Sequence, residues 1–225
     1  MFEKAKKGSR IPKILIMGPA GGGKTLGAIK LMRGIIQSDK FLLADTEDNS
    51  ATIYHEYDFF HTNVDKKDQN VTGFLTVMKN ALDSGMQGFI QDSMSPYWND
   101  LTNRAAQAGG SFSVWKDLTP VHDSYMSKIL SYKIPFIGTA RTKQGYVIEQ
   151  INGKNVPKKV GQEPVLGKDA DFNFDIVFYV DPMTHRARID KCRYREIEEH
   201  FEKEGGDVQL SEELGKLIAK ITLNQ

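Results

Sequence analysis

The chain has 225 residues, 40% hydrophobic and 26% charged, with a formal net charge of +1. This composition is typical of a folded globular protein, and the near-neutral charge excludes a global field that attracts nucleic acid. A single cysteine excludes a disulfide framework and favours a reducing compartment, and no apolar run has the length of a membrane span. We therefore expect a cytoplasmic protein without a membrane partner.

The first expected elements are a strand and a helix around a glycine-rich motif. We expect residues 1–12 to form a flexible N-terminal segment and residues 13–225 to form one domain. Lys13–Met17 reads as a buried strand, and apolar residues from Leu26 to Ile36 follow helical spacing. Between the two, the residues Gly18, Pro19, Ala20, Gly21, Gly22, Gly23, Lys24 and Thr25 fit G-x-x-x-x-G-K-[ST], the phosphate-binding P-loop.

This motif predicts a site for ATP and Mg²⁺. Glycines let the backbone N–H groups of the loop, through Leu26, close around phosphate oxygens, and the following helix directs its positive dipole end at the same anion. Lys24 supplies a cation to the β- and γ-phosphates, and Thr25 offers a hydroxyl to Mg²⁺. The alternative is a glycine-rich turn with a chance lysine, which the strand–loop–helix context disfavours.

The middle of the chain alternates strands with helices. Strands are expected at Phe41–Asp45, Gly88–Asp92 and Ile134–Thr139, and helices at Val71–Leu82, Ser95–Ala108 and Trp115–Ser131, whereas polar, aromatic-rich sequence fills the chain between Asp45 and about Asn70. This alternation predicts βαβ units and an α/β fold with a mainly parallel central sheet.

The pattern changes in the last third of the chain. Asn152-Gly153 lies between two strand-like runs and predicts a β-hairpin. Phe174–Val180 and Arg186–Cys192 predict two further strands, an antiparallel extension of the sheet. A final amphipathic helix is expected to begin after Ser211 and to run to Thr222.

Acidic residues end two of the predicted strands. Asp92 follows an apolar run, as in a Walker B strand, and can hold the Mg²⁺ shell opposite Thr25; the alternative is an aspartate that caps the next helix. Glu47, just after the strand that ends at Asp45, can orient or deprotonate an attacking water. The alternative for Glu47 is an ordinary solvated surface acid.

In this order, the motifs resemble the RecA-type recombinase ATPase core, from about Lys13 to Arg195. The short chain is most similar to phage-encoded RecA-like proteins, which look like single-strand annealing ATPases. The resemblance implies ATP hydrolysis, single-stranded DNA binding and annealing or strand pairing in phage recombination, in the host cytoplasm. It also implies a homo-oligomer, as ring or filament, and a single-strand-binding protein is a further expected partner.

The same resemblance assigns roles to individual residues. It implies that Lys24 and Glu47 are catalytic, that Tyr54 stacks on adenine, and that Thr139 senses the γ-phosphate in place of the family's usual glutamine. It also implies that Lys191 and Arg193 reach the ATP of a neighbouring subunit. The alternative for these two is a solvated face of a strand.

Two segments are expected to face DNA. The first is the region from Gln107 to Trp115, and the second is the hairpin from Gln144 to Gly167. A basic, aromatic-bearing hairpin suits a groove for single strands; ordinary surface lysines are the alternative. The expected DNA-binding residues are Arg141, Lys143, Tyr146, Lys154, Lys158 and Lys159.

Other interpretations remain open. Phe2 and Ala5 fit Phe-x-x-Ala, a short oligomerisation peptide, although two fixed residues match easily by chance. A nucleotide or small-molecule kinase is a rival function, but such kinases usually carry an arginine-rich lid, and no arginine follows Arg104 up to Lys133. A nucleotide-dependent switch without DNA binding is a third.

Overall fold

The structure is a computed structural model, and it describes residues 10–151, 154–167 and 170–223, with the backbone alone between 146 and 160. Phe2 and Ala5, the proposed oligomerisation peptide, therefore lie outside the described residues, as does most of the expected N-terminal segment. Among the described helices, none combines the length and apolarity that crossing a bilayer requires.

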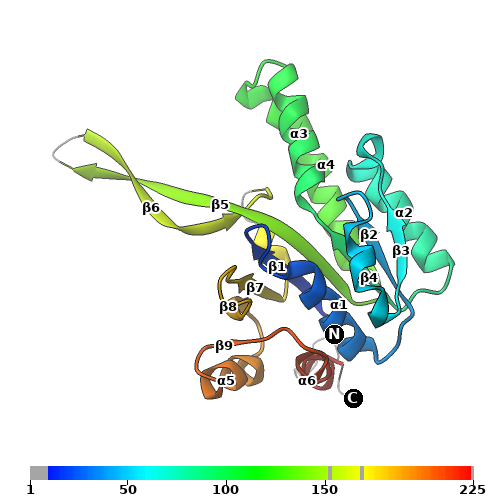
Figure 1. The fold of residues 1–225 in the computed structure, drawn as a ribbon. Helices are drawn as coiled ribbons and strands as arrows, with labels where there is room; N and C mark the ends of the chain where they lie inside the picture. The colour runs from blue at the N-terminus through cyan, green and yellow to red at the C-terminus, as the bar shows by residue number, and fades with distance from the viewer. Residues whose placement is uncertain (1–9, 152–153, 168–169, 224–225) are drawn as a thin grey trace, which may run out of the picture.

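One sheet organises the chain, with the order β3-β2-β4-β5-β1-β7-β8-β9 and with β6 paired to β5 (Figure 1). The first five strands and β7 are parallel, and the last strands run antiparallel. The strands are β1 (Lys13–Gly18), β2 (Phe41–Asp45), β3 (Phe60–Asn63), β4 (Gly88–Asp92), β5 (Phe136–Ile151), β6 (Lys154–Pro164), β7 (Ile176–Val180), β8 (Ala187–Cys192) and β9 (Asp207–Val208). The predicted α/β class, parallel core and antiparallel C-terminal extension are confirmed.

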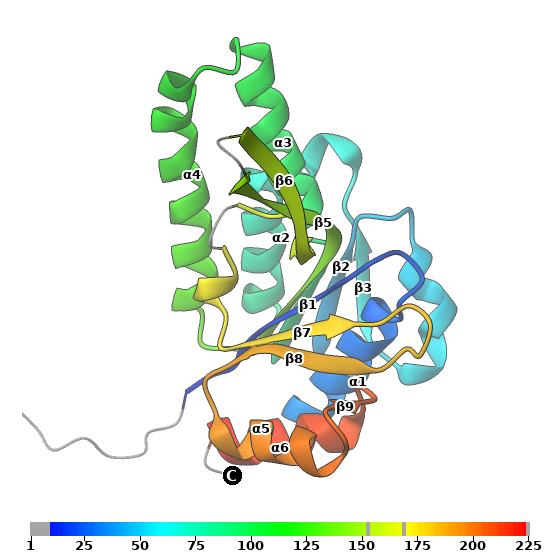
Figure 2. The same cartoon turned by 90° about the vertical axis from the view of Figure 1, so that its left-hand side faces the viewer.

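Helices cover both faces of this sheet (Figure 2). The side chains of β1 alternate: Ile14 and Ile16 join the core under α1, α5 and α6, whereas Leu15 and Met17 join the core under α2, α3 and α4. The helices are α1 (Lys24–Ile36), α2 (Val71–Asp83), α3 (Ser95–Gln107), α4 (Phe112–Ser131), α5 (Arg195–Lys203) and α6 (Glu212–Thr222), with short 3₁₀ segments η1 (Ser50–Tyr57), η2 (Lys66–Asp68) and η3 (Ala170–Asn173).

Several predicted elements need correction. The polar stretch before Asn70 contains the edge strand β3, which pairs with β2, as well as two 3₁₀ turns. The segment from Gln107 to Trp115 is not all loop, because α4 already begins at Phe112. Helix α5 was not predicted at all. Its two buried residues, Ile197 and Phe201, are four positions apart in a segment that is otherwise mostly charged.

The predicted hairpin is confirmed, but its first strand is not separate from the core. β5 runs unbroken for 16 residues from the sheet centre into the hairpin, where it pairs antiparallel with β6 on both sides of residues 152–153. Between the pairs Gln144/Gln162 and Tyr146/Lys159, β6 has one extra residue. Gly161, with φ of 80°, provides the left-handed conformation that such a bulge needs. The hairpin projects away from the body (Figure 1).

Helices α1 and α6 touch through glycines. A Cβ placed on Gly34 would lie 2.1 Å from the Glu212 oxygen and 2.8 Å from the Gly215 Cα atom. A Cβ on Gly215 would lie 2.4 Å from the Leu31 oxygen. Because backbone atoms cannot yield as side chains do, the two helices reach this separation only with glycine at both positions.

We predict that Gly34→Ala destabilises the fold by about 1–3 kcal/mol, the usual cost of overpacking. Alanine improves helix propensity by ~1 kcal/mol, so the measured loss is what remains after that gain. Chemical denaturation measures the free energy of unfolding, and Lys220→Ala on the exposed side of α6 serves as the control. A Gly34→Ala protein as stable as wild type would show that α6 can move away from α1 at no cost.

Candidate functional site

The P-loop joins β1 to α1 as the sequence predicts. Gly21 and Gly23 have φ of 76° and 87°, in the left-handed region that other residues enter only with strain. Gly23 is also the N-cap residue of α1. The loop therefore ends with the first N–H groups of the helix directed at the space in front of it, where an anion is stabilised.

The loop lies close to the end of β7. A Cβ on Gly18 would be 2.7 Å from the Val180 oxygen. Any side chain at this position would push β1 away from β7 just where the loop begins. The glycine is thus required by packing between strands as well as by the loop itself.

Lys24 stands at the mouth of the loop. Its Nζ atom donates a hydrogen bond to the Pro19 oxygen at 2.7 Å. Burial lowers the pKa of Lys24, and the carboxylates of Asp92 and Glu47 oppose that shift. The lysine is therefore a cation held between the loop backbone and two acids.

Asp92, at the end of β4, is a buried acid of the cavity, with 7% of its surface exposed. The hydroxyls of Thr139 on β5 and Thr25 on α1 both donate to its carboxylate. Burial raises the pKa of Asp92; the two hydroxyl hydrogen bonds lower it, and the nearby acids Asp45 and Glu47 raise it further. Thr139 thus contacts Asp92.

Glu47 is positioned by the turn after β2. The Asp45 carboxylate accepts hydrogen bonds from the backbone N–H of Glu47 at 2.6 Å and of Ala51 at 2.8 Å. Thr46 connects the same turn to β4, because its backbone N–H donates to the backbone carbonyl of Asp92 at 2.8 Å and its hydroxyl accepts from the Ser93 N–H at 3.0 Å. The Glu47 side chain is 48% exposed and forms an ion pair with Arg141.

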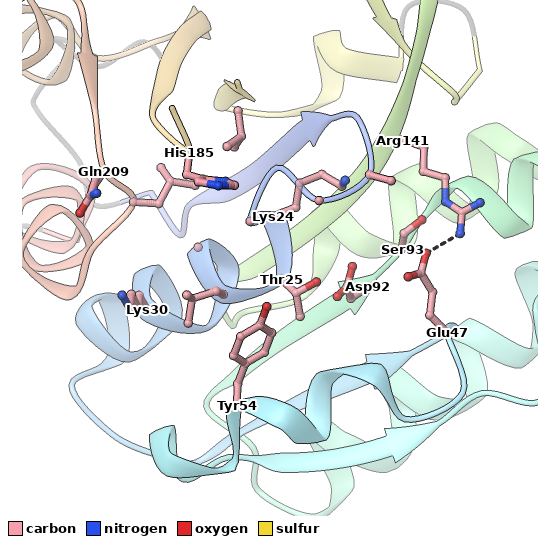
Figure 3. Close-up of a pocket in the computed structure, with 17 residues that line it drawn as sticks. Lys24, Thr25, Lys30, Glu47, Tyr54, Asp92, Ser93, Arg141, His185 and Gln209 are labelled. Atoms are coloured by element: carbon pink, nitrogen blue, oxygen red, sulfur yellow. Dashed lines mark hydrogen bonds and ion pairs between the residues drawn. The ribbon is translucent and has the colours of Figure 1, made fainter. Parts of the chain in front are cut away.

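These side chains surround one cavity of about 660 Å³ (Figure 3). Of the predicted residues, the cavity lining includes Ala20, Gly21, Gly23, Lys24, Thr25, Leu26, Glu47, Tyr54 and Asp92, but not Gly18, Pro19, Gly22 or Thr139. Arg141, predicted as a DNA contact, also lines it. In Figure 3, Tyr54 on η1 lies below Lys24 and the loop, and Lys30 and Gln209 lie to their left.

Seven lining residues were not predicted as site residues from the sequence: Gly27, Lys30, Ser93, Val180, His185, Gln209 and Leu210. Most come from the C-terminal third, where β7 and the segment before α6 return to the P-loop. His185 sits in the β7–β8 turn with φ of 55°. No sequence spacing links these residues to the P-loop motif. The left-handed conformation of His185 is the one local feature among them, and several residue types adopt that conformation, so it does not identify a site residue.

The structure does not bring Lys191 and Arg193 into this cavity. Strand β8 runs antiparallel to β7, so Ala187 pairs with Val180 near the P-loop, whereas Cys192 pairs with Ile176 at the opposite edge. There the Lys191 Nζ donates to the backbone carbonyl of Asp171 at 3.0 Å, and the Arg193 guanidinium donates to the backbone carbonyl of Phe172 at 3.1 Å. Their expected role toward a neighbouring subunit stays a prediction.

The structure describes the side chains of only some of the expected DNA-binding residues. Arg141 and Lys143 are exposed on β5. The side chains of Tyr146, Lys154, Lys158 and Lys159 lie outside the described part of the chain, although their backbones belong to the two hairpin strands. In the other expected segment, Phe112 is 94% exposed, and Trp115 stacks on Trp98 with ring centroids 5.4 Å apart.

The residues present fit a nucleotide with a divalent cation. A hydroxyl and a carboxylate, Thr25 and Asp92, meet beside the P-loop, and hard oxygen ligands are those that Mg²⁺ prefers. Lys24 supplies a cation on the same side, and the backbone of the loop leaves its first helical N–H groups directed at the cavity. This donor set fits a triphosphate together with its metal better than it fits a metal bound by protein groups alone.

Comparisons with known proteins give limited guidance. No protein-family model matches the chain, and no curated protein matches it. Solved structures that match include a KaiC-like protein from the hyperthermophilic archaeon Pyrococcus horikoshii OT3, 14% identical, with 81% of this chain and 79% of that chain covered at a TM-score of 0.48.

We predict that Thr139→Val weakens Mg²⁺-dependent nucleotide binding at low pH. Loss of the hydroxyl removes a hydrogen bond that lowers the pKa of Asp92, so the carboxyl holds its proton to higher pH and the acidic limb of the binding profile moves upward. Calorimetric titration across pH measures this. Thr142→Val is the matched control, because the Thr142 hydroxyl is buried without a hydrogen-bond partner in the described structure. Coincident profiles for the two variants would contradict the assignment.

Proposed function

We propose that this protein binds and hydrolyses ATP with Mg²⁺ and couples hydrolysis to single-stranded DNA. One observation carries the proposal: Lys24, Asp92 and Glu47 come from three separate elements and meet around one cavity at the P-loop. A cation, a buried carboxylate and an exposed carboxylate are the groups that a triphosphate site needs for binding, metal coordination and activation of water.

Phosphate binding follows from the loop. The N–H groups at the start of α1 and the Lys24 ammonium stabilise the charge of the β- and γ-phosphates. Thr25 and Asp92 would hold Mg²⁺, which neutralises charge that develops on the transferred phosphoryl group. Tyr54 lines the same cavity and offers its ring to the base.

Glu47 is the candidate general base. Its backbone is fixed by the Asp45 carboxylate, yet its side chain is half exposed at the cavity. A carboxylate in that place can accept a proton from the water that attacks the γ-phosphate. Its ion pair with Arg141 occupies the carboxylate in this structure.

The DNA part of the proposal is supported by the hairpin. Its two strands carry the basic residues predicted from the sequence, and they leave the body directly after Arg141, which lines the nucleotide cavity. By resemblance of the motifs to short RecA-like phage proteins, we propose annealing or strand pairing in recombination as the biological role. A homo-oligomer and a single-strand-binding protein would be the partners.

Release of inorganic phosphate from ATP, with and without oligothymidylate, tests the proposal. We expect Mg²⁺-dependent hydrolysis that DNA stimulates, and we expect Lys24→Ala to abolish ATP binding with unchanged circular dichroism. Phosphate transferred to a small molecule instead of water would favour a kinase. Hydrolysis at the same rate with and without DNA would favour a nucleotide-dependent switch. An unchanged ATP affinity in Lys24→Ala would show that the P-loop does not bind ATP.

We also propose that a neighbouring subunit completes the site with Lys191 and Arg193, which face away from this chain's own cavity. Hydrolysis builds negative charge on the leaving phosphate, and a cation placed there stabilises it. Specific activity should then rise with protein concentration.

A mixture of two inactive variants tests this arrangement. Subunits with Lys24→Ala combined with subunits carrying Lys191→Ala and Arg193→Ala should regain part of the activity, since some interfaces pair an intact cavity with intact cations. If each variant assembles, yet the mixture stays inactive, these two residues serve only their own chain, where they contact η3.

A further inference from the structure

A second cavity lies on the other side of the Glu47–Arg141 ion pair. It has a volume of about 370 Å³, and Arg141 is the one residue that lines both this cavity and the nucleotide cavity. Its walls come from the turn after β2, from residues 66–70 and from the first turns of α3. The two cavities are therefore neighbours that meet at a single side chain.

The second cavity is polar and positively charged. Lys66, Lys67 and Arg141 line it, against one acid, Asp100, which faces Arg104 at 3.7 Å. In the parts of the chain that the structure describes, neither lysine side chain has a hydrogen bond or an ion pair with another residue. The other lining residues include the amide side chains of Asn99 and Asn103, and none of the lining residues is aromatic. This chemistry fits a phosphodiester, whose oxygens accept hydrogen bonds and carry charge, better than it fits a base.

Arg141 has a fixed backbone and a replaceable partner. Its N–H donates to the Ser95 hydroxyl at 3.0 Å, and its carbonyl accepts from the Val165 N–H at 2.7 Å. The guanidinium, 61% exposed, is bound to Glu47, 48% exposed. Ion pairs between such exposed groups are weak, whereas a guanidinium binds phosphate through two parallel hydrogen bonds. A phosphate in the second cavity can thus displace Glu47.

We propose that the second cavity binds a phosphodiester of single-stranded DNA and that Arg141 leaves Glu47 to contact it. The freed Glu47 carboxylate then accepts the proton of the attacking water, and DNA binding thereby activates ATP hydrolysis. This inference rests on the proposed function and adds to it a DNA-binding cavity and a mechanism by which DNA activates hydrolysis. Arg141 acts here as a positioning residue, since it governs the state of Glu47.

The coupling must run in both directions, because a ligand that breaks the ion pair is itself opposed by that pair. Glu47→Gln removes the charge that competes for Arg141. Its affinity for oligothymidylate should therefore rise about two- to fivefold, the factor that an exposed ion pair is worth. Fluorescence anisotropy of a labelled oligothymidylate measures this without any hydrolysis. Unchanged or weaker oligothymidylate binding by this variant would contradict the proposed competition between Glu47 and DNA for Arg141.

Arg141→Gln tests the same pair from the other side. Without the guanidinium, Glu47 is free at all times, so hydrolysis without DNA should rise toward the stimulated wild-type rate and stimulation should vanish. Arg141→Lys keeps the charge and should retain part of the stimulation. A variant that melts like wild type but hydrolyses slowly with and without DNA would overturn the proposal.

The two lysines test the location. Lys66→Gln with Lys67→Gln should weaken oligothymidylate binding and lower the slope of log affinity against log salt by about 1.4, at ~0.7 per lost phosphate contact. Lys203→Gln with Lys220→Gln, on α5 and α6, removes equal charge at a distance and should leave the slope unchanged. Equal slopes for both double variants would place the DNA elsewhere.

Failure of the inference is distinguishable from failure of the proposed function. If wild type binds no oligothymidylate and DNA does not alter its hydrolysis, both are wrong. If wild type is stimulated while the Arg141 and lysine variants behave like the control, only the inference is wrong. Inorganic polyphosphate is the further probe, since equal stimulation by it would overturn the assignment of the cavity to DNA.

Discussion

The buried carboxylate of Asp92 is the point on which the candidate site depends. It receives hydroxyl hydrogen bonds from α1 and from β5, and both donors are in place only because the strands keep one register. Asp92 pairs with Asp45 across β2 and β4, and Thr139 pairs with Ile16 across β5 and β1. A slip of one residue would turn Thr139 to the opposite face of the sheet. The hydrophobic packing of both sheet faces thus fixes the chemistry at the strand ends.

Much of this arrangement was predictable because its signals are local. The P-loop, the strand ending at Asp92 and the alternation of strands with helices each occupy a short window of sequence. The role of Glu47 was predicted from its spacing together with the family resemblance, and the structure adds its position at the cavity and its unforeseen partner, Arg141. That partner is 94 residues away, and only the parallel sheet brings the two together.

The missed features have physical causes. β3 is a four-residue edge strand with no fully buried side chain, so it lacks the alternation that marks a half-buried strand. Ile197 and Phe201 supply the only buried contacts of α5 within a charged segment. The polar sequence after Thr139 suggested that the strand ended there, yet pairing with β6 sustains β5 beyond the sheet. His185 and Gln209 reach the cavity through tertiary packing that no sequence window contains.

The continuity of β5 has a mechanical consequence. At ~3.3 Å per residue, its 16 residues form an arm of roughly 50 Å, with the contact to Asp92 near one end and Ile151 at the other. Arg141 and Thr139 therefore lie on the same continuous strand as the hairpin, without an intervening loop. The extra residue of β6 lets the ribbon bend at one place while β5 itself stays extended. We therefore expect a displacement of the hairpin to move Arg141, which lines the cavity at the P-loop.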